Sequence, residues 1–210
     1  MAGDVKKGAT YQDVLDAPEL LVAEILNGEL HLSPRPGGPH AAATSTLGYV
    51  LGPPFHLGTT GPGGWIILDE PELHLDQDIV VPDLAGWRRE RMAAVPNQAF
   101  ISIAPDWACE MLSRSTAATD RADKLPLYAR AGVQHVWLVD AVQRTLEVLR
   151  AHAGTWLIVA VHRGDAIVRA EPFDAIEIDL SVLWASIAPP PVRGTRTSEE
   201  AAEYGVEPGF

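Results

Sequence analysis

The pattern of apolar and polar residues predicts a chain that alternates short strands with helices. In residues 22–32, VAEILNGELHL, two apolar-rich runs flank Asn27 and Gly28. Asn-Gly between such runs is typical of a hairpin with a two-residue turn. That turn would place Glu24 opposite His31 on the neighbouring strand.

Segments on both sides of this hairpin predict helices and strands. The stretch TYQDVLDA, residues 10–17, has a capping-box pattern and indicates a short helix. HAAATSTLGYVLG, residues 40–52, indicates a longer helix. WIILDEPELHL, residues 65–75, contains one or two strands, and IVVPDLAGW, residues 79–87, reads as the returning strand.

The middle of the chain predicts a buried parallel crossover. DWACEMLS, residues 106–113, has apolar residues on both faces, as interior strands do. Residues 116–133 indicate an irregular helix, and QHVWLVD, residues 134–140, indicates the next buried strand. A strand–helix–strand order favours a right-handed crossover between parallel strands.

The remaining chain predicts a β-meander over residues 144–168 and a short helix over residues 180–187. The tail, residues 189–210, is Pro-rich and polar, which is typical of disorder. We therefore expect one α/β (α+β) domain over residues 1–188, with a mixed β-sheet, flanking helices and a C-terminal meander.

Composition narrows the classes of protein that fit this pattern. The chain has 210 residues, 47% of them hydrophobic, one cysteine and a formal net charge of −12. A single cysteine excludes a disulfide framework and indicates a cytoplasmic compartment, and no apolar run approaches membrane-spanning length. The charge argues against a protein that coats nucleic acid by bulk attraction, but it is compatible with a nuclease that uses metal ions.

Three charged residues interrupt the apolar pattern. Asp83 follows Pro82 in an apolar run, Glu110 lies inside a core strand, and Lys124 lies in the following helix. Two carboxylates on adjacent strands could hold Mg²⁺, with a nearby ammonium stabilising phosphoryl oxygens. The structural alternatives are a turn-forming Asp83, a buried ion pair of Glu110 with Lys124 or Arg114, and a solvated Lys124.

Several separated motifs resemble one known family. VVPDLAGWRRER, APDWACEMLSRST and DRADKLPLYARAGVQHVWLVD resemble the Uma family of restriction endonucleases, within the PD-(D/E)XK nuclease superfamily. The earlier AEILNGELHLSPRP fits the same pattern, so the resemblance extends from about residue 10 to residue 150. It implies a restriction-endonuclease-like core and an endonuclease that acts on DNA with Mg²⁺ or Mn²⁺.

The resemblance assigns roles to the three charged residues. It implies that Asp83 and Glu110 are catalytic metal ligands. Two residues after Glu110 stands Leu112 rather than the superfamily's lysine, and the match to the family's variant form is Lys124 on the next helix. A second Pro-Asp pair ends at Asp106, which shares a strand face with Glu110 and could also support the metal.

Four further residues are candidates for supporting roles. Glu24 could be an additional acid at the metal or a cross-strand partner of His31 on the hairpin. His40 could bind phosphate, act as a base, or simply begin a helix. Ser113 could contact phosphate or turn the chain, and Asp120 could cap the helix or orient Lys124.

Two function classes follow from these residues. The first is a Mg²⁺-dependent endonuclease acting on DNA. Such an enzyme could act as a homodimer, because cleavage of both strands of a duplex needs two sites. The alternative is a non-catalytic module that binds DNA or protein on a nuclease-like fold, since fold alone does not establish activity.

Overall fold

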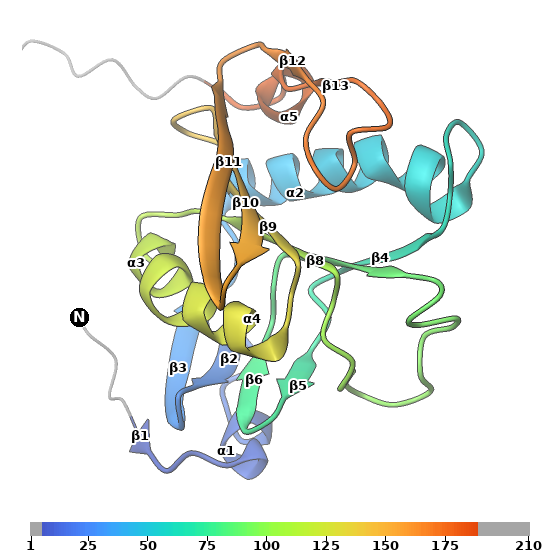
Figure 1. Cartoon of the computed structure of the whole chain (residues 1–210). Coiled ribbons are helices and arrows are strands. Elements are labelled where there is room, and N and C mark those ends of the chain that lie inside the picture. The colour runs from blue at the N-terminus through green and yellow to red at the C-terminus, as the bar shows by residue number, and fades with distance from the viewer. Residues whose placement is uncertain (1–5, 189–210) are drawn as a thin grey trace, which may run out of the picture.

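The computed structural model describes residues 6–188, and the predicted tail lies outside the described residues. Its strands form one mixed sheet, one antiparallel sheet and a separate two-stranded sheet (Figure 1). The larger sheet has six strands in the order β11-β10-β9-β8-β7-β4, and the smaller has five in the order β1-β3-β2-β6-β5.

The six-stranded sheet carries the predicted crossover. Its strands are β4 (Trp65–Asp69), β7 (Leu84–Arg88), β8 (Trp107–Met111), β9 (His135–Asp140), β10 (Thr145–His152) and β11 (Thr155–Arg163). Strands β8 and β9 are parallel, whereas the other neighbours in this sheet are antiparallel. The predicted parallel connection and the mixed sheet are therefore confirmed.

The five-stranded sheet is built on the predicted hairpin. Its strands are β1 (Lys6–Lys7), β2 (Leu21–Leu26), β3 (Glu29–Pro34), β5 (Leu73–Leu75) and β6 (Asp78–Val80). Asn27 and Gly28 both have positive φ, as this tight turn requires, and Glu24 pairs in register with His31. The hairpin prediction is confirmed.

Helical segments connect the strands. They are α1 (Tyr11–Leu15), α2 (Gly38–Leu51), η1 (Gly52–Leu57), α3 (Ala117–Thr119), η2 (Asp120–Lys124), α4 (Leu125–Ala131) and α5 (Ser181–Trp184). Helix α1 lies beside the smaller sheet, and α2 and α3–α4 lie on the larger one (Figure 1). The predicted irregular helix is one continuous segment in which the π-helical turn η2 joins α3 to α4. None of the helices in residues 6–188 is long and apolar enough to cross a bilayer.

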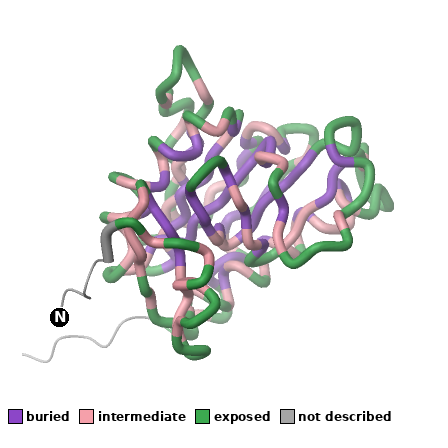
Figure 2. Tube along the Cα trace, turned by 90° about the horizontal axis from the view of Figure 1, so that it is seen from below, coloured by how far each residue is buried: buried purple, intermediate pink, exposed green. Residues whose placement is uncertain are grey.

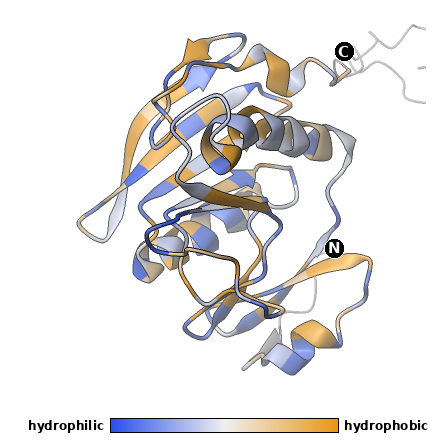
Figure 3. Cartoon of the chain, turned by 90° about the vertical axis from the view of Figure 1, so that its right-hand side faces the viewer, coloured by the Kyte–Doolittle hydropathy of each residue, from blue (hydrophilic) through white to orange (hydrophobic). Residues whose placement is uncertain are grey.

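Two hydrophobic cores lie on the two faces of the six-stranded sheet. Strand β8 contributes Trp107, Cys109 and Met111 to the core shared with α2 and α5, and Ala108 to the core shared with α4 and the smaller sheet. The helical segment α3–α4 lies between the larger sheet and the smaller one (Figure 1). Buried residues follow the strands through the interior (Figure 2), and those strands are mainly hydrophobic (Figure 3).

Two details differ from the sequence-based expectation. Residues 79–87 do not form one strand, because Pro82 and Asp83 separate β6 in the smaller sheet from β7 in the larger one. Proline lacks the backbone donor that a continuous ladder needs at this point. The last strand of the predicted meander, β12 (Ile167–Val168), leaves the larger sheet and pairs with β13 (Ile178–Asp179).

Candidate active site

Strands β7 and β8 bring the two predicted acids together. Leu84 pairs with Cys109, so one further step along the antiparallel register sets Asp83 opposite Glu110. Directly opposite residues in such a pair have Cβ atoms about 4.5–5.5 Å apart. Leu84 and Cys109 face the α2 core, so their neighbours face the other side, where both carboxylates line one cleft.

The carboxylate of Asp83 is held from two directions. Its Oδ2 accepts a 2.7 Å hydrogen bond from the backbone N–H of Met111, the residue after Glu110. Its Oδ1 contacts Nε2 of His40 near the start of α2. The break in the strand at Pro82 thus frees Asp83 to point into the cleft while these contacts fix its orientation.

Glu110 is buried, with 2% of its surface exposed. Its Oε1 accepts a hydrogen bond from the hydroxyl of Tyr128 at 2.5 Å, and its Oε2 lies 3.2 Å from Nζ of Lys124. Burial raises the pKa of Glu110 well above its usual value, Lys124 opposes that change, and neighbouring carboxylates add to it. Holding this acid ionised therefore requires positive charge in the cleft.

Lys124 stands at the centre of a group of acids. Its Nζ lies 3.0 Å from Glu24, 3.2 Å from Glu110 and 3.6 Å from Asp120. Burial alone would lower the pKa of this lysine, but the surrounding carboxylates raise it well above its usual value. The ammonium is therefore charged and fixed in place, which distinguishes it from a solvated surface lysine.

Asp120 opens the π-helical turn that ends at Lys124, four residues on. It follows α3 and caps no helix N-terminus; its Oδ1 faces Lys124. Burial raises the pKa of Asp120 to about 6, which Lys124 and a hydrogen bond with Thr116 oppose. Its buried Oδ2 has no hydrogen-bond partner among the described residues.

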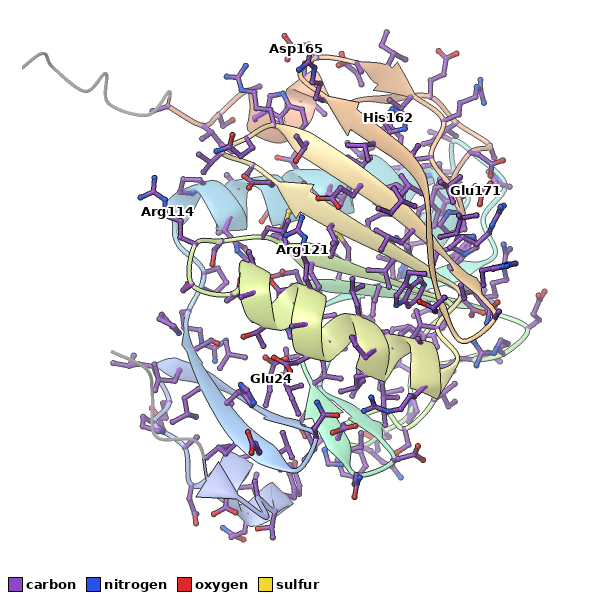
Figure 4. The ribbon with its side chains drawn as sticks, turned by 60° about the vertical axis from the view of Figure 1, so that its left-hand side comes forward. Glu24, Arg114, Arg121, His162, Asp165 and Glu171 are labelled. Atoms are coloured by element: carbon purple, nitrogen blue, oxygen red, sulfur yellow. The ribbon has the colours of Figure 1, made fainter. Side chains whose placement is uncertain are left out.

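The cleft between these groups has a volume of about 130 Å³. It lies where β2, the start of α2, the β7–β8 pair and the segment α3–η2 meet. Glu24 reaches it from β2, beneath the helical segment that carries Lys124 (Figure 4). The carboxylate of Glu24 is anchored by a 2.8 Å hydrogen bond from the backbone N–H of Val81.

The charges of the cleft fit a divalent cation. Four carboxylates line the cleft with the single ammonium of Lys124: those of Glu24, Glu110 and Asp120, which contact the ammonium, and that of Asp83. When all are ionised, three negative charges are in excess, and carboxylate oxygens are the ligands that Mg²⁺ prefers. Among residues 6–188, no cluster of three or more His, Cys, Asp or Glu forms a complete metal site. Mg²⁺ usually keeps several waters, so two carboxylates suffice to hold it.

The structure brings all the predicted site residues together in this cleft. The residues that line it include Asp83, Glu110, Lys124, Glu24, His40, Ser113 and Asp120. The ion pair of Glu110 with Lys124, foreseen as a structural alternative, is present within the same group. Asp106 does not line the cleft. Its carboxylate binds the side chain of Arg91 at 2.8 Å and accepts a hydrogen bond from the backbone N–H of Arg88.

Two features of the site were not anticipated from the sequence. In the sequence Tyr128 reads as a core aromatic, and it is fully buried, yet its hydroxyl donates a hydrogen bond to Glu110. Its i+4 spacing from Lys124 is the sequence feature that could have indicated a place beside the site. At the rim of the cleft, Arg35 pairs with Glu70 at 3.2 Å. The SPRP segment after the hairpin carries this arginine, but nothing in the sequence indicates its partner.

Comparisons with known proteins agree with this architecture. The model of the Uma2 family, described as "Putative restriction endonuclease", matches residues 10–182. A crystal structure described as a putative nuclease belonging to DUF820, from Anabaena variabilis, has a TM-score of 0.68 and 23% identity, and the match covers 84% of this chain and 98% of that chain. At this identity the likeness establishes the fold, which is the predicted restriction-endonuclease-like core. No curated protein matches the chain.

Proposed function

Because the chain belongs to the Uma2 family of restriction-endonuclease-like proteins, we propose that it is a metal-dependent endonuclease that hydrolyses DNA phosphodiester bonds. The observation that carries this proposal is the buried ammonium of Lys124, surrounded by carboxylates beside Asp83. A fixed cation next to paired acids is suited to the charge that develops on phosphoryl oxygens during hydrolysis.

Asp83 and Glu110 would hold the cation, Mg²⁺ or Mn²⁺. When bound, such an ion supplies a water of lowered pKa and offsets charge on the phosphoryl group. The hydrogen bonds from Met111 and Tyr128 orient the two carboxylates toward the cleft. Preorganised ligands avoid the entropy cost of ordering side chains when the ion and substrate arrive.

Lys124 would stabilise the phosphoryl oxygens rather than the metal. Its position is maintained by Glu24 and Asp120, which we assign as positioning residues. His40 orients Asp83 through its Nε2. Ser113 lines the same cleft, and its Oγ accepts a 3.2 Å hydrogen bond from the backbone N–H of Thr116, so it turns the chain where its hydroxyl could contact a phosphate. Each of the seven predicted residues thus has a role in one site.

The second candidate is a binding module without catalysis, favoured by the net charge of −12 and by the leucine at the superfamily's lysine position. Calorimetric titration with Mn²⁺ separates the two. The nuclease proposal expects binding that Glu110→Ala abolishes and that the surface variant Glu147→Ala retains. Wild-type protein that binds no Mn²⁺ would favour the binding module.

We further propose that the enzyme is a homodimer in the cytoplasm. Strand β11 supports self-association: it forms an edge of the larger sheet and exposes Leu157, Ile158 and Val161 at 46%, 57% and 61%. Long apolar edges tend to pair with another chain, and Thr155–Arg163 contains no acid that would repel a second copy of this acidic chain. Sedimentation of wild type and Ile158→Lys would test this, with the variant expected as a monomer.

A further inference from the structure

A second cavity of about 320 Å³ lies beside the acidic cleft, between α2, η1 and β4. The two linings have no residue in common, but residues close together in the chain line both. The hydroxyl of Thr44, which lines the second cavity, bonds the carbonyl of His40 at 3.0 Å, and Leu84 in its lining follows Asp83. Leu84 faces the α2 core whereas Asp83 faces the cleft, so a strand whose phosphate lies in the cleft would reach this cavity with a neighbouring nucleotide that passes the start of β7.

The chemistry of the cavity differs from that of the cleft. Its lining contains one carboxylate, Asp69, together with hydroxyls, apolar side chains and two rings. Tyr49 stands at its edge with 78% of its surface exposed. An exposed aromatic ring beside a concave surface can stack on a nucleobase, a contact that tolerates any base.

His56 adds a directional polar group. Its Nδ1 lies 3.0 Å from the backbone nitrogen and 3.1 Å from the carbonyl oxygen of Ile67, so the backbone of β4 holds the ring in either tautomer. The ring adds a polar edge to the lining, in which Ser45 offers a hydroxyl donor and Asp69 an acceptor. Nucleobase edges present both donors and acceptors, which a pocket with both can satisfy.

Two glycines in the lining lack an explanation within the described chain. Gly48 lies inside α2, where glycine destabilises a helix relative to alanine. A Cβ built at Gly48 or at Gly52 meets no atom within 4 Å. Packing among the described residues thus does not require glycine at either position, whereas close approach of a ligand would.

We propose that this cavity is a subsite for one unpaired nucleobase adjacent to the scissile phosphate. The inference rests on the proposed nuclease function and specifies its substrate as a strand with at least one base outside a duplex. The volume is at the low end of the range for small-molecule sites, roughly 300–1,000 Å³, which suits a single base rather than a duplex.

The test measures by fluorescence anisotropy how tightly the protein binds a fluorescein-labelled single strand of 12 nucleotides in the presence of Ca²⁺. The affinity is compared with that for a labelled strand of equal length made of abasic residues. The full chain should bind the base-bearing strand about fivefold or more tightly, the scale of one stacked base. Tyr49→Ala should remove this preference and Tyr49→Phe should keep it. Leu57→Ala is the matched control, because Leu57 is 67% exposed on η1 but lies outside the lining.

A second variant guards against loss of folding. Gly48→Leu should fill the cavity and remove the preference while the melting temperature stays at or above that of wild type. Duplex DNA of the same sequence should show a smaller effect of Tyr49→Ala than the single strand. Equal affinity of wild type for base-bearing and abasic strands, or a preference that survives Tyr49→Ala, would overturn the proposal.

The outcome is separable from that of the nuclease proposal. Titration with Mn²⁺ alone reports on the acidic cleft, and Tyr49→Ala should leave it unchanged. Base-dependent binding without Mn²⁺ binding would retain the subsite and reject the metal-dependent nuclease. Mn²⁺ binding without a preference for the base-bearing strand would retain the metal-dependent nuclease and reject the subsite.

Discussion

The backbone N–H of Met111 donates a 2.7 Å hydrogen bond to Oδ2 of Asp83, which ties the two acidic motifs of the chain together. Asp83 follows the break between β6 and β7, and Met111 ends β8 next to Glu110. The bond places the Asp83 carboxylate beside Glu110 even though the two residues are far apart in sequence.

We predict that Asp83→Ala abolishes Mn²⁺ binding, because it removes one of two ligands. Asp106→Ala should bind Mn²⁺ like wild type, since Asp106 engages Arg91 and the backbone of Arg88 away from the cleft. Calorimetry on both variants checks this. Loss of binding in Asp106→Ala alone would instead assign the metal to the second Pro-Asp pair.

Lys124→Met should reduce DNA cleavage by about 100-fold or more while leaving Mn²⁺ affinity near that of wild type. It should also destabilise the metal-free protein by roughly 3–5 kcal/mol at neutral pH, because buried carboxylates lose their partner. Arg121→Met is the control, since Arg121 lies three residues away on the same helical segment (Figure 4) and pairs with Glu147 on β10. Cleavage by Lys124→Met at the wild-type rate would remove the lysine from the mechanism.

Stability should fall as pH rises through the titration of Asp120. Its pKa is about 6 in the folded protein because burial raises it, against about 4 in an unfolded chain. Between these values the folded state holds a proton that the unfolded state lacks, so the free energy of unfolding declines by up to roughly 3 kcal/mol. Metal-free protein should melt at a higher temperature at pH 5 than at pH 7.5, and Asp120→Asn should reduce the difference. An identical pH profile in wild type and Asp120→Asn would contradict this.

Local patterns in the sequence predicted much of the fold. Asn27-Gly28 specifies the hairpin because both positions need positive φ, and Glu110 stands out because its neighbours in β8 are all buried. The resemblance to the Uma family is confirmed, and its motifs led to the residues of the cleft. These features depend on neighbours in sequence or on motif spacing.

Features set by tertiary contacts could not be predicted in this way. Strand pairing decides that Pro82 and Asp83 separate two sheets, since each half of the apolar run finds a different partner. Tyr128 reads as a core aromatic, and its hydrogen bond to Glu110 becomes visible only when the helix is placed over β8. Which face of the helical segment packs on the sheet also decides which basic side chains lie near the acids of the cleft. Arg130, on the same segment as Lys124, pairs with Asp78 and not with these acids.

Deleting the chain after Pro191 should leave the melting temperature unchanged. The removed segment has few large apolar residues and many turn formers, so it contributes little burial. Differential scanning calorimetry of the two lengths at equal concentration checks this. A clearly lower melting temperature would mean that the tail packs on the domain or on a partner subunit.

We expect Asp83, Glu110 and Lys124 to form a metal-dependent nuclease centre, and the decisive assay is nicking of supercoiled plasmid DNA. Wild type and Glu110→Gln are compared with Mg²⁺, with Mn²⁺ and with EDTA. Glutamine preserves the size of the side chain but removes the charge that would hold the ion. Wild type should nick the plasmid with either ion and not with EDTA, and Glu110→Gln should not nick it at all. Plasmid left intact by wild type with both ions, or cut equally by Glu110→Gln, would contradict it.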